Sequence, residues 1–103
     1  MSENFNNLTP AQTERLVLLA EECGEVIKAA MKILRHGYES TNPDAQPALS
    51  NNRGDLMDEL GHVRFAEHLL IESGDLVNPR IALSAAQKRT KIQKYLHHNE
   101  ASL

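Results

Sequence analysis

Apolar residues recur every three or four positions along much of this chain, and polar segments divide the pattern into three parts. The first part covers residues 16–34, and this spacing is that of one face of an α-helix. Residues 9–12 before it read Thr-Pro-Ala-Gln, a capping box with proline at the first helical position. Gly37 is a typical helix stop. The pattern predicts a helix from Pro10 to about His36.

The same signals predict two further helices. Asn51 or Asn52 can cap the second helix. We expect it to run from about residue 53 to residue 73, with Gly74 as its stop. The third helix covers residues 78–97, because an Asn-Pro pair provides its cap and first turn and its apolar period then runs to the end of that range.

No stretch alternates apolar and polar residues as a strand does, so we expect an all-α fold. The expected architecture is an antiparallel helical bundle of a long, a central and a C-terminal helix in one domain, residues 1–103. Residues 38–51 form a polar loop long enough to cover a site, and residues 1–8 and 99–103 are expected to be flexible. Because the central helix is apolar on two sides, we expect oligomerisation to complete the bundle.

Composition excludes several classes of protein. The net charge of -3 and the pI near 5.9 do not fit a protein that binds duplex nucleic acid. No apolar run approaches the roughly 18 residues of a membrane span, and no charged and apolar leader is present, so we expect a cytoplasmic protein without a membrane partner. The single cysteine, Cys23, excludes an internal disulfide, and its place among apolar residues predicts a buried side chain.

Three carboxylates lie close together on the first helix. Glu21, Glu22 and Glu25 fall within an arc of about 100°, because a helix turns by about 100° per residue. The opposite side of the helix is apolar and carries Leu16, Ala20, Cys23, Ile27, Ala30 and Leu34. Acids at this spacing repel one another unless a cation lies between them, so the stretch is either a solvated face or a cation site.

A second acidic cluster lies on the second helix, where Asp55, Glu59 and His62 share one stripe beside Asp58. If this stripe faces the acids of the first helix, carboxylates and an imidazole meet where two antiparallel helices cross. Mg²⁺ binds such carboxylates together with waters and substrate phosphates. Basic residues of the first and third helices can then hold the phosphates.

Residues 21–25, EECGE, followed by residues 58–62, DELGH, resemble the paired EExxE and ExxD motifs of the MazG-like all-α nucleoside triphosphate pyrophosphohydrolases. Residues 33–37, ILRHG, and the Asn-Arg pair at 52–53 are similar to small phage and bacterial members of that family. So is the lysine-rich last helix, which ends in YLHH at 95–98. Together these segments span most of the chain.

The resemblance implies hydrolysis of a nucleoside triphosphate, often a non-standard or deoxy one, to the monophosphate and pyrophosphate. It implies Mg²⁺ as the metal, with Mn²⁺ as the alternative, and a homodimer or homotetramer with sites at helices packed across subunits. By position, the metal ligands are Glu22, Glu25 and Glu59, with His62 or Asp58.

The resemblance also assigns the remaining roles by position. Glu21 and Glu22 are the candidate catalytic acids. The resemblance places Lys88, Lys91 and Lys94 where the family has residues that bind the substrate phosphates, and the charge pattern adds Lys28 or Lys32 of the first helix as a further candidate.

One residue departs from the family pattern, because His62 stands where the family has an aspartate. Imidazole is softer than carboxylate and suits Mn²⁺ or Zn²⁺ better than Mg²⁺. Either Asp58 or Asp55 completes the site, or the metal preference differs, or activity has been lost. In the last case the chain is a helical module that dimerises or binds a nucleotide or metal. Among enzymes, phosphoribosyl-ATP pyrophosphatase shares the motif pattern and is a further alternative.

Overall fold

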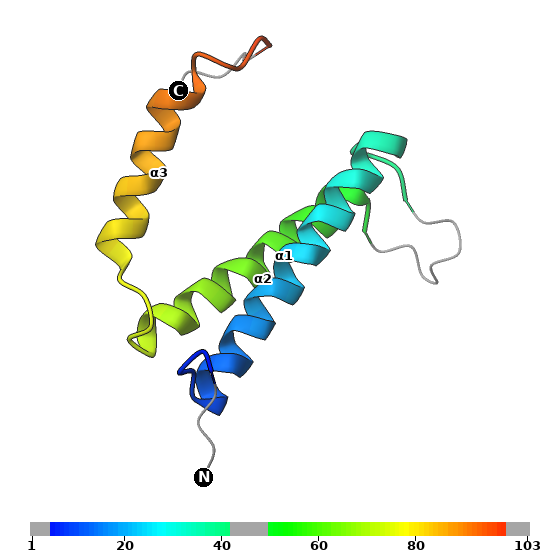
Figure 1. Ribbon diagram of the computed structural model, residues 1–103. Coiled ribbons are helices and arrows are strands. Elements are labelled where there is room, and N and C mark those ends of the chain that lie inside the picture. The colour runs from blue at the N-terminus through cyan, green and yellow to red at the C-terminus, as the bar shows by residue number, and fades with distance from the viewer. Residues whose placement is uncertain (1–4, 42–49, 99–103) are drawn as a thin grey trace.

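The computed structural model describes residues 5–41 and 50–98. They form three helices, which are α1 (Pro10–His36), α2 (Asn52–Glu72) and α3 (Asn78–Ile92). α1 and α2 lie side by side, and α3 leads away from them (Figure 1). The all-α class is therefore confirmed. No helix in the described part of the chain has a stretch apolar enough to cross a bilayer.

The connection between α1 and α2 is described only near its two ends. There, Thr41 and Asn51 form an isolated antiparallel β-bridge, and the described residues contain no strand. The expectations for the middle of the loop and for the outer parts of the flexible ends fall on residues 42–49, 1–4 and 99–103, which lie outside the described residues.

Local signals determine both ends of α1 as predicted. The Thr9 hydroxyl accepts a hydrogen bond from the Gln12 amide at 3.1 Å, and the Gln12 side-chain oxygen accepts one from the Thr9 amide at 2.9 Å. Gly37 ends the helix with a φ of 86°, a conformation that residues with a Cβ rarely adopt. Its amide donates to the Ile33 carbonyl at 2.7 Å, so a terminal carbonyl of the helix is paired.

Two adjacent asparagines have different tasks at the start of α2. Asn51 is the cap, and its Oδ1 accepts a hydrogen bond from the Gly54 amide at 2.9 Å. Asn52 is 8% exposed, and its Nδ2 donates to the Gly37 carbonyl at 3.1 Å. Asn52 therefore ties the start of α2 to the end of α1.

Ionic and aromatic contacts strengthen this tie. The Arg53 guanidinium lies 2.7 Å from the Glu39 carboxylate and 4.2 Å from the centre of the Tyr38 ring. The Asn51 side chain donates to the same Glu39 carboxylate at 3.1 Å. Residues on both sides of the loop thus hold one end of the α1–α2 pair together.

α3 differs from the sequence prediction at both ends. Asn78 is its first residue, not its cap, because Val77 takes the cap position without a side-chain hydrogen bond. The helix ends at Ile92 instead of near His97. The Tyr95 amide donates to the Ile92 carbonyl at 2.9 Å, so the chain continues as a turn in which the apolar spacing persists without a helix.

The contact between α1 and α2 follows one stripe of each helix. Its members recur at alternating intervals of three and four residues, the spacing of antiparallel helices in contact. In α1 the less exposed stripe is Leu19, Glu22, Val26, Ala29 and Ile33, and in α2 it is Asn52, Leu56, Glu59, Val63, Ala66 and Leu70. Ala66 and Leu70 are each 1% exposed and form the most buried part of this core.

The predicted apolar side of the first helix is not the side that packs on α2. Ile27 is 66% exposed and Leu34 is 77% exposed, and Cys23 is exposed, so the prediction that Cys23 is buried is wrong. The reason is geometric, because a pair of helices covers only one stripe of each, and these residues lie about a quarter turn around α1 from that stripe. Among the described residues α2 is likewise not central, since Phe65 on its second apolar side is 59% exposed and α3 leads away from it (Figure 1).

An ion pair closes the opposite end of the α1–α2 pair. Arg15 of α1 donates two hydrogen bonds to Asp75, which follows α2, with N–O distances of 2.7 and 3.2 Å. Hydrogen bonding from Arg15 lowers the pKa of the Asp75 carboxyl below its ordinary value of 3.8, and the charge of Arg15 adds to this effect. The same pairing raises the pKa of Arg15.

We expect the Arg15–Asp75 pair to make stability depend on acid pH. Because the pKa of Asp75 is lowered by folding, the pair stabilises the fold above pH 3.8, and the stabilisation is lost as the pH falls through the lowered pKa. Asp75→Asn should melt a few degrees below the wild type near neutral pH, and the difference should disappear in strong acid. Thermal melts followed by circular dichroism measure this.

The control is Glu72→Gln, which removes the exposed partner of His68 and should change the neutral melting temperature little. A gap between wild type and Asp75→Asn that keeps its full size in strong acid would contradict the assignment.

Candidate functional site

Two carboxylates and an imidazole from the two packed helices meet near the middle of their contact. Glu22 of α1 and Glu59 and His62 of α2 each offer one ligand atom, and these three atoms all lie within 4.8 Å of one another. The Nδ1 atom of His62 lies 3.3 Å from a Glu59 oxygen and 3.5 Å from a Glu22 oxygen. The predicted meeting of the two acidic clusters is present in the fold.

The helix packing explains why these groups converge. Glu22 and Glu59 occupy positions within the contact stripes, and their side chains are only 22% and 24% exposed. His62 lies one turn after Glu59 at the rim, with 58% of its side chain exposed. Two acids are therefore held toward each other by the backbone, and the imidazole approaches them from the solvent side.

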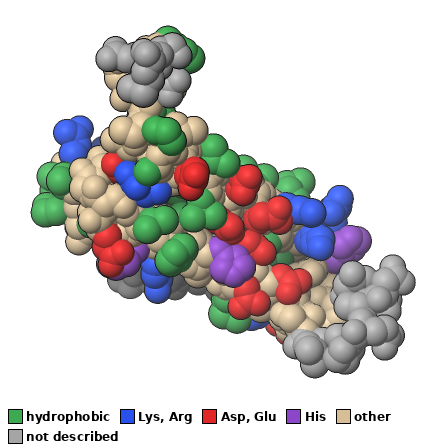
Figure 2. Space-filling model, turned by 90° about the horizontal axis from the view of Figure 1, so that it is seen from below, with side chains coloured by type: hydrophobic (Ala, Val, Ile, Leu, Met, Phe, Trp, Pro, Cys, Tyr) green, Lys and Arg blue, Asp and Glu red, His purple; other side chains and the backbone are tan. Residues whose placement is uncertain are grey.

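A pocket of about 260 Å³ lies beside this cluster and is lined by Glu59 and His62, whereas Glu22 is not among its lining residues. Its wall also contains acids from both helices and two lysines of α1, together with two residues of the helix contact. These are Glu25, Lys28, Lys32, Asp55 and Asp58, with Ala29 and Asn52. Figure 2 shows acidic side chains gathered around a histidine on this side of the molecule, with lysine and arginine side chains next to them.

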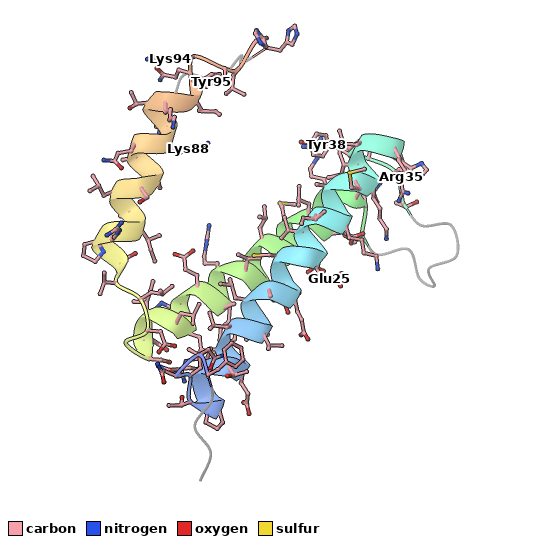
Figure 3. All side chains as sticks on the ribbon, in the orientation of Figure 1. Glu25, Arg35, Tyr38, Lys88, Lys94 and Tyr95 are labelled. Carbon is pink, nitrogen blue, oxygen red and sulfur yellow. The ribbon has the colours of Figure 1, made fainter. Side chains whose placement is uncertain are left out.

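Several predicted site residues do not take part in this pocket. Glu21 is exposed on α1 and is not among the residues of the pocket wall. Lys88, Lys91 and Lys94 are exposed on α3 or just after it, and none of them lines the pocket. In Figure 3, Glu25 lies at the α1–α2 pair, whereas Lys88 and Lys94 lie along the departing third helix. Within one chain, these lysines therefore lie outside the wall of this pocket.

The donor set fits a divalent cation. Two carboxylate oxygens and one imidazole nitrogen form a mixed hard and borderline ligand set, which suits Mn²⁺ and Zn²⁺ and is less well matched to Mg²⁺. Three protein ligands leave further coordination positions to water or substrate. Lys28 and Lys32 in the same wall carry the opposite charge, so the pocket can also accept an anionic group.

A second pocket, of about 450 Å³, adjoins the first toward the end of α1. The two share Lys32, Asn52 and Asp55, so they are neighbours. The other described residues in the wall of the second pocket are Arg35, His36, Ser40 and Thr41. The sequence did not predict this pocket, because the pocket forms only when the residues after Gly37 fold back beside α2. The Asn52 and Arg53 amides bind the carbonyls of Ser40 and Tyr38 there, so the Asn-Arg pair at 52–53 was the sequence feature that pointed to this contact.

Comparison of the chain with protein-family models, with curated proteins and with solved structures finds no match. The resemblance to the MazG-like hydrolases therefore depends on the residues quoted from the sequence.

Proposed function

We propose that the protein is a metal-dependent pyrophosphohydrolase that converts a nucleoside triphosphate to the monophosphate and pyrophosphate. The observation that supports this most directly is the convergence of Glu22, Glu59 and His62, two of which line a pocket that also contains Lys28 and Lys32. A cation site next to basic side chains is the combination that a polyphosphate requires, because both offset its charge.

In this proposal each group of the pocket has a separate task. Glu22 and Glu59 hold the cation, and His62 is the third protein ligand, in the position of the family's aspartate. When bound, the cation supplies charge neutralisation for the phosphate chain and activation of a water. Lys28 and Lys32 bind phosphate oxygens, and Glu25, which lies in the pocket wall, accepts a hydrogen bond from the attacking water in place of Glu21.

We also propose that the lysines of α3 act in a second copy of the chain. Residues 76–98 contain Lys and Arg but no Asp or Glu, whereas the α1–α2 pair carries most of the acids. Among the described residues, α3 has no packing partner of comparable extent (Figure 1). Large apolar side chains such as Ile27 and Leu34 are exposed on α1. A homodimer or homotetramer in which α3 lies against the partner's α1–α2 pair buries apolar surface and brings Lys88 to an acidic pocket.

The competing proposal is a helical module that dimerises or binds a nucleotide or metal without turnover. His62 is the residue that favours it, because a neutral, exposed imidazole is a weak replacement for a carboxylate ligand of Mg²⁺. The two proposals differ in one outcome, which is the release of pyrophosphate.

The acids of the cluster are tested by Glu22→Gln and Glu59→Gln. With Mn²⁺ and a panel of NTPs and dNTPs, we expect each variant to release pyrophosphate more than about 100-fold more slowly than the wild type, since loss of an outer-shell partner alone costs about 10- to 100-fold. Glu14→Gln, an exposed acid of α1 outside both pockets, is the matched control and should keep the wild-type rate. If the wild type shows no turnover with any metal, the module is the better description.

The role of His62 is tested by its exchange for the family's residue. His62→Asp supplies a hard oxygen in place of a borderline nitrogen, so the ratio of the Mg²⁺-supported rate to the Mn²⁺-supported rate should rise severalfold. Initial rates with each metal at saturation measure this ratio. An unchanged ratio would show that His62 does not contact the metal.

Mixing two inactive variants tests the contribution of α3 from a partner. One variant carries Glu59→Gln, and the other carries Lys88→Gln, Lys91→Gln and Lys94→Gln together. Random exchange of dimers leaves one intact site in each mixed dimer, so about a quarter of the wild-type rate should return. The control mixture of Glu22→Gln with Glu59→Gln should remain inactive, because both changes affect the same side of the site. Exchange without recovery in the first mixture would contradict the shared site.

A further inference from the structure

The face of the α1–α2 pair that points away from the first pocket is apolar and exposed. The pocket is lined by Glu25 and Lys28 of α1 and by Asp58 of α2, so the other side of each helix forms the opposite face. On α2 this face carries Met57 and Leu60, which are 61% and 49% exposed. α3 leads away from the pair, and an apolar face left open in this way is typical of a protein interaction surface (Figure 1). On α1 the face carries a row of residues that we call the α1 seam, which consists of Leu16, Ala20, Cys23, Ile27, Ala30 and Leu34.

The α1 seam has the spacing and the symmetry of a contact between two copies of one helix. Its members alternate at intervals of four and three residues, as the core positions of paired helices do. The order of side-chain sizes is similar from either end, with leucines outermost, alanines next and Cys23 and Ile27 in the middle. Glu25 is the midpoint of the row. An antiparallel copy therefore forms three kinds of layer, which are Leu16 opposite Leu34, Ala20 opposite Ala30 and Cys23 opposite Ile27.

Charged residues on the exposed side of α1 favour the antiparallel direction. Glu14, Glu21, Lys28 and Arg35 follow one another at intervals of seven residues, so they share one line on the helix, and all four are exposed. The line is acidic in its first half and basic in its second half. An antiparallel neighbour places the acidic half beside the basic half, whereas a parallel neighbour places like charges together. The antiparallel arrangement also places the amino end of one helix dipole beside the carboxyl end of the other.

Gly24 lies beside the α1 seam, at the level of its midpoint. No atom lies within 4 Å of the position that a Cβ would take there, so packing within the chain does not require a glycine. Glycine in the middle of a helix is destabilising relative to alanine. A second helix that crosses at this level accounts for Gly24, because the missing side chain lets the two backbones approach closely.

We propose that two copies of the chain associate through this face, with their α1 helices packed antiparallel about a two-fold axis at the level of Gly24 and Glu25. The contact is isologous, so the α1 seam of each copy meets the α1 seam of the other. The first pocket of each copy lies on the opposite face and stays open to a ligand. The inference rests on the proposed function only in taking a second copy as the partner. It adds the surface and the register, and both apply equally to a module without turnover.

Cross-linking through paired cysteines tests the register. Ala20→Cys and Ala30→Cys are introduced together into full-length Cys23→Ser, and the protein is oxidised and run on a non-reducing gel. The two new cysteines lie about 15 Å apart along one helix, so they form a disulfide only between copies. We expect the pair to form a covalent dimer at least about tenfold faster than either single variant, because each single cysteine lies about 15 Å from its own copy in this register.

Further variants test whether the contact uses this face. Adding Ile27→Glu to the cysteine pair puts a charge in the middle of the α1 seam and should slow the cross-link about tenfold or more. Phe65→Glu puts the same charge at an exposed apolar residue of α2 outside the seam and should leave the rate unchanged. Glu25→Cys with Arg35→Cys, a pair that is also ten residues apart but lines the two pockets, should not cross-link. Circular dichroism checks that each variant remains helical.

The possible results separate this inference from the proposed function. Absence of a covalent dimer from the paired cysteines, or a rate that Ile27→Glu leaves unchanged, would overturn the interface. Single cysteines that cross-link as fast as the pair would overturn the antiparallel register, because a parallel contact places each residue beside its own copy. None of these readings requires a nucleotide or a metal. A covalent dimer of the paired cysteines together with a wild type that releases no pyrophosphate would overturn the hydrolase and leave the interface in place.

Discussion

Glu22 and Glu59 occupy positions in the contact between two helices where the spacing otherwise places apolar side chains, and each is less than a quarter exposed. Two carboxylates that the backbone holds toward each other repel, and partial burial weakens the screening of that repulsion by water. An apolar pair at these positions would pack α1 on α2 more favourably. We therefore propose that a cation offsets this electrostatic cost, with His62 as a further ligand.

Contacts at the two ends of the α1–α2 pair keep Glu22 and Glu59 opposite each other. At one end, Arg15 and Asp75 form a two-hydrogen-bond ion pair. At the other, Asn52 bonds the Gly37 carbonyl and Arg53 pairs with Glu39. A shift of α2 by one turn would break both ends at once, so few relative positions of the helices are compatible with all of these contacts. The site thus depends on residues at both ends of the helix pair, most of which lie outside its pocket.

The parts that sequence alone predicted are those governed by local chemistry. The capping box at Thr9, the stop at Gly37 and the cap at Asn51 follow from hydrogen bonds within a few residues. The face of α1 that packs could not be chosen in this way, because the stripe through Ile27 and the stripe through Val26 are both apolar at helical spacing, and only the position of α2 distinguishes them. The sequence also could not predict which residues lie near the lysines of α3, since that depends on how the helices pack and, in the proposed oligomer, on how copies of the chain pack.

The most direct measurement of the central claim is a crystal structure of the protein soaked in Mn²⁺, with anomalous scattering recorded to locate the ion. We expect one Mn²⁺ peak within about 2.5 Å of an oxygen of Glu22, an oxygen of Glu59 and a nitrogen of His62. Saturating Mn²⁺ that leaves these three side chains without an ion, with the two carboxylates turned apart into solvent, would contradict it.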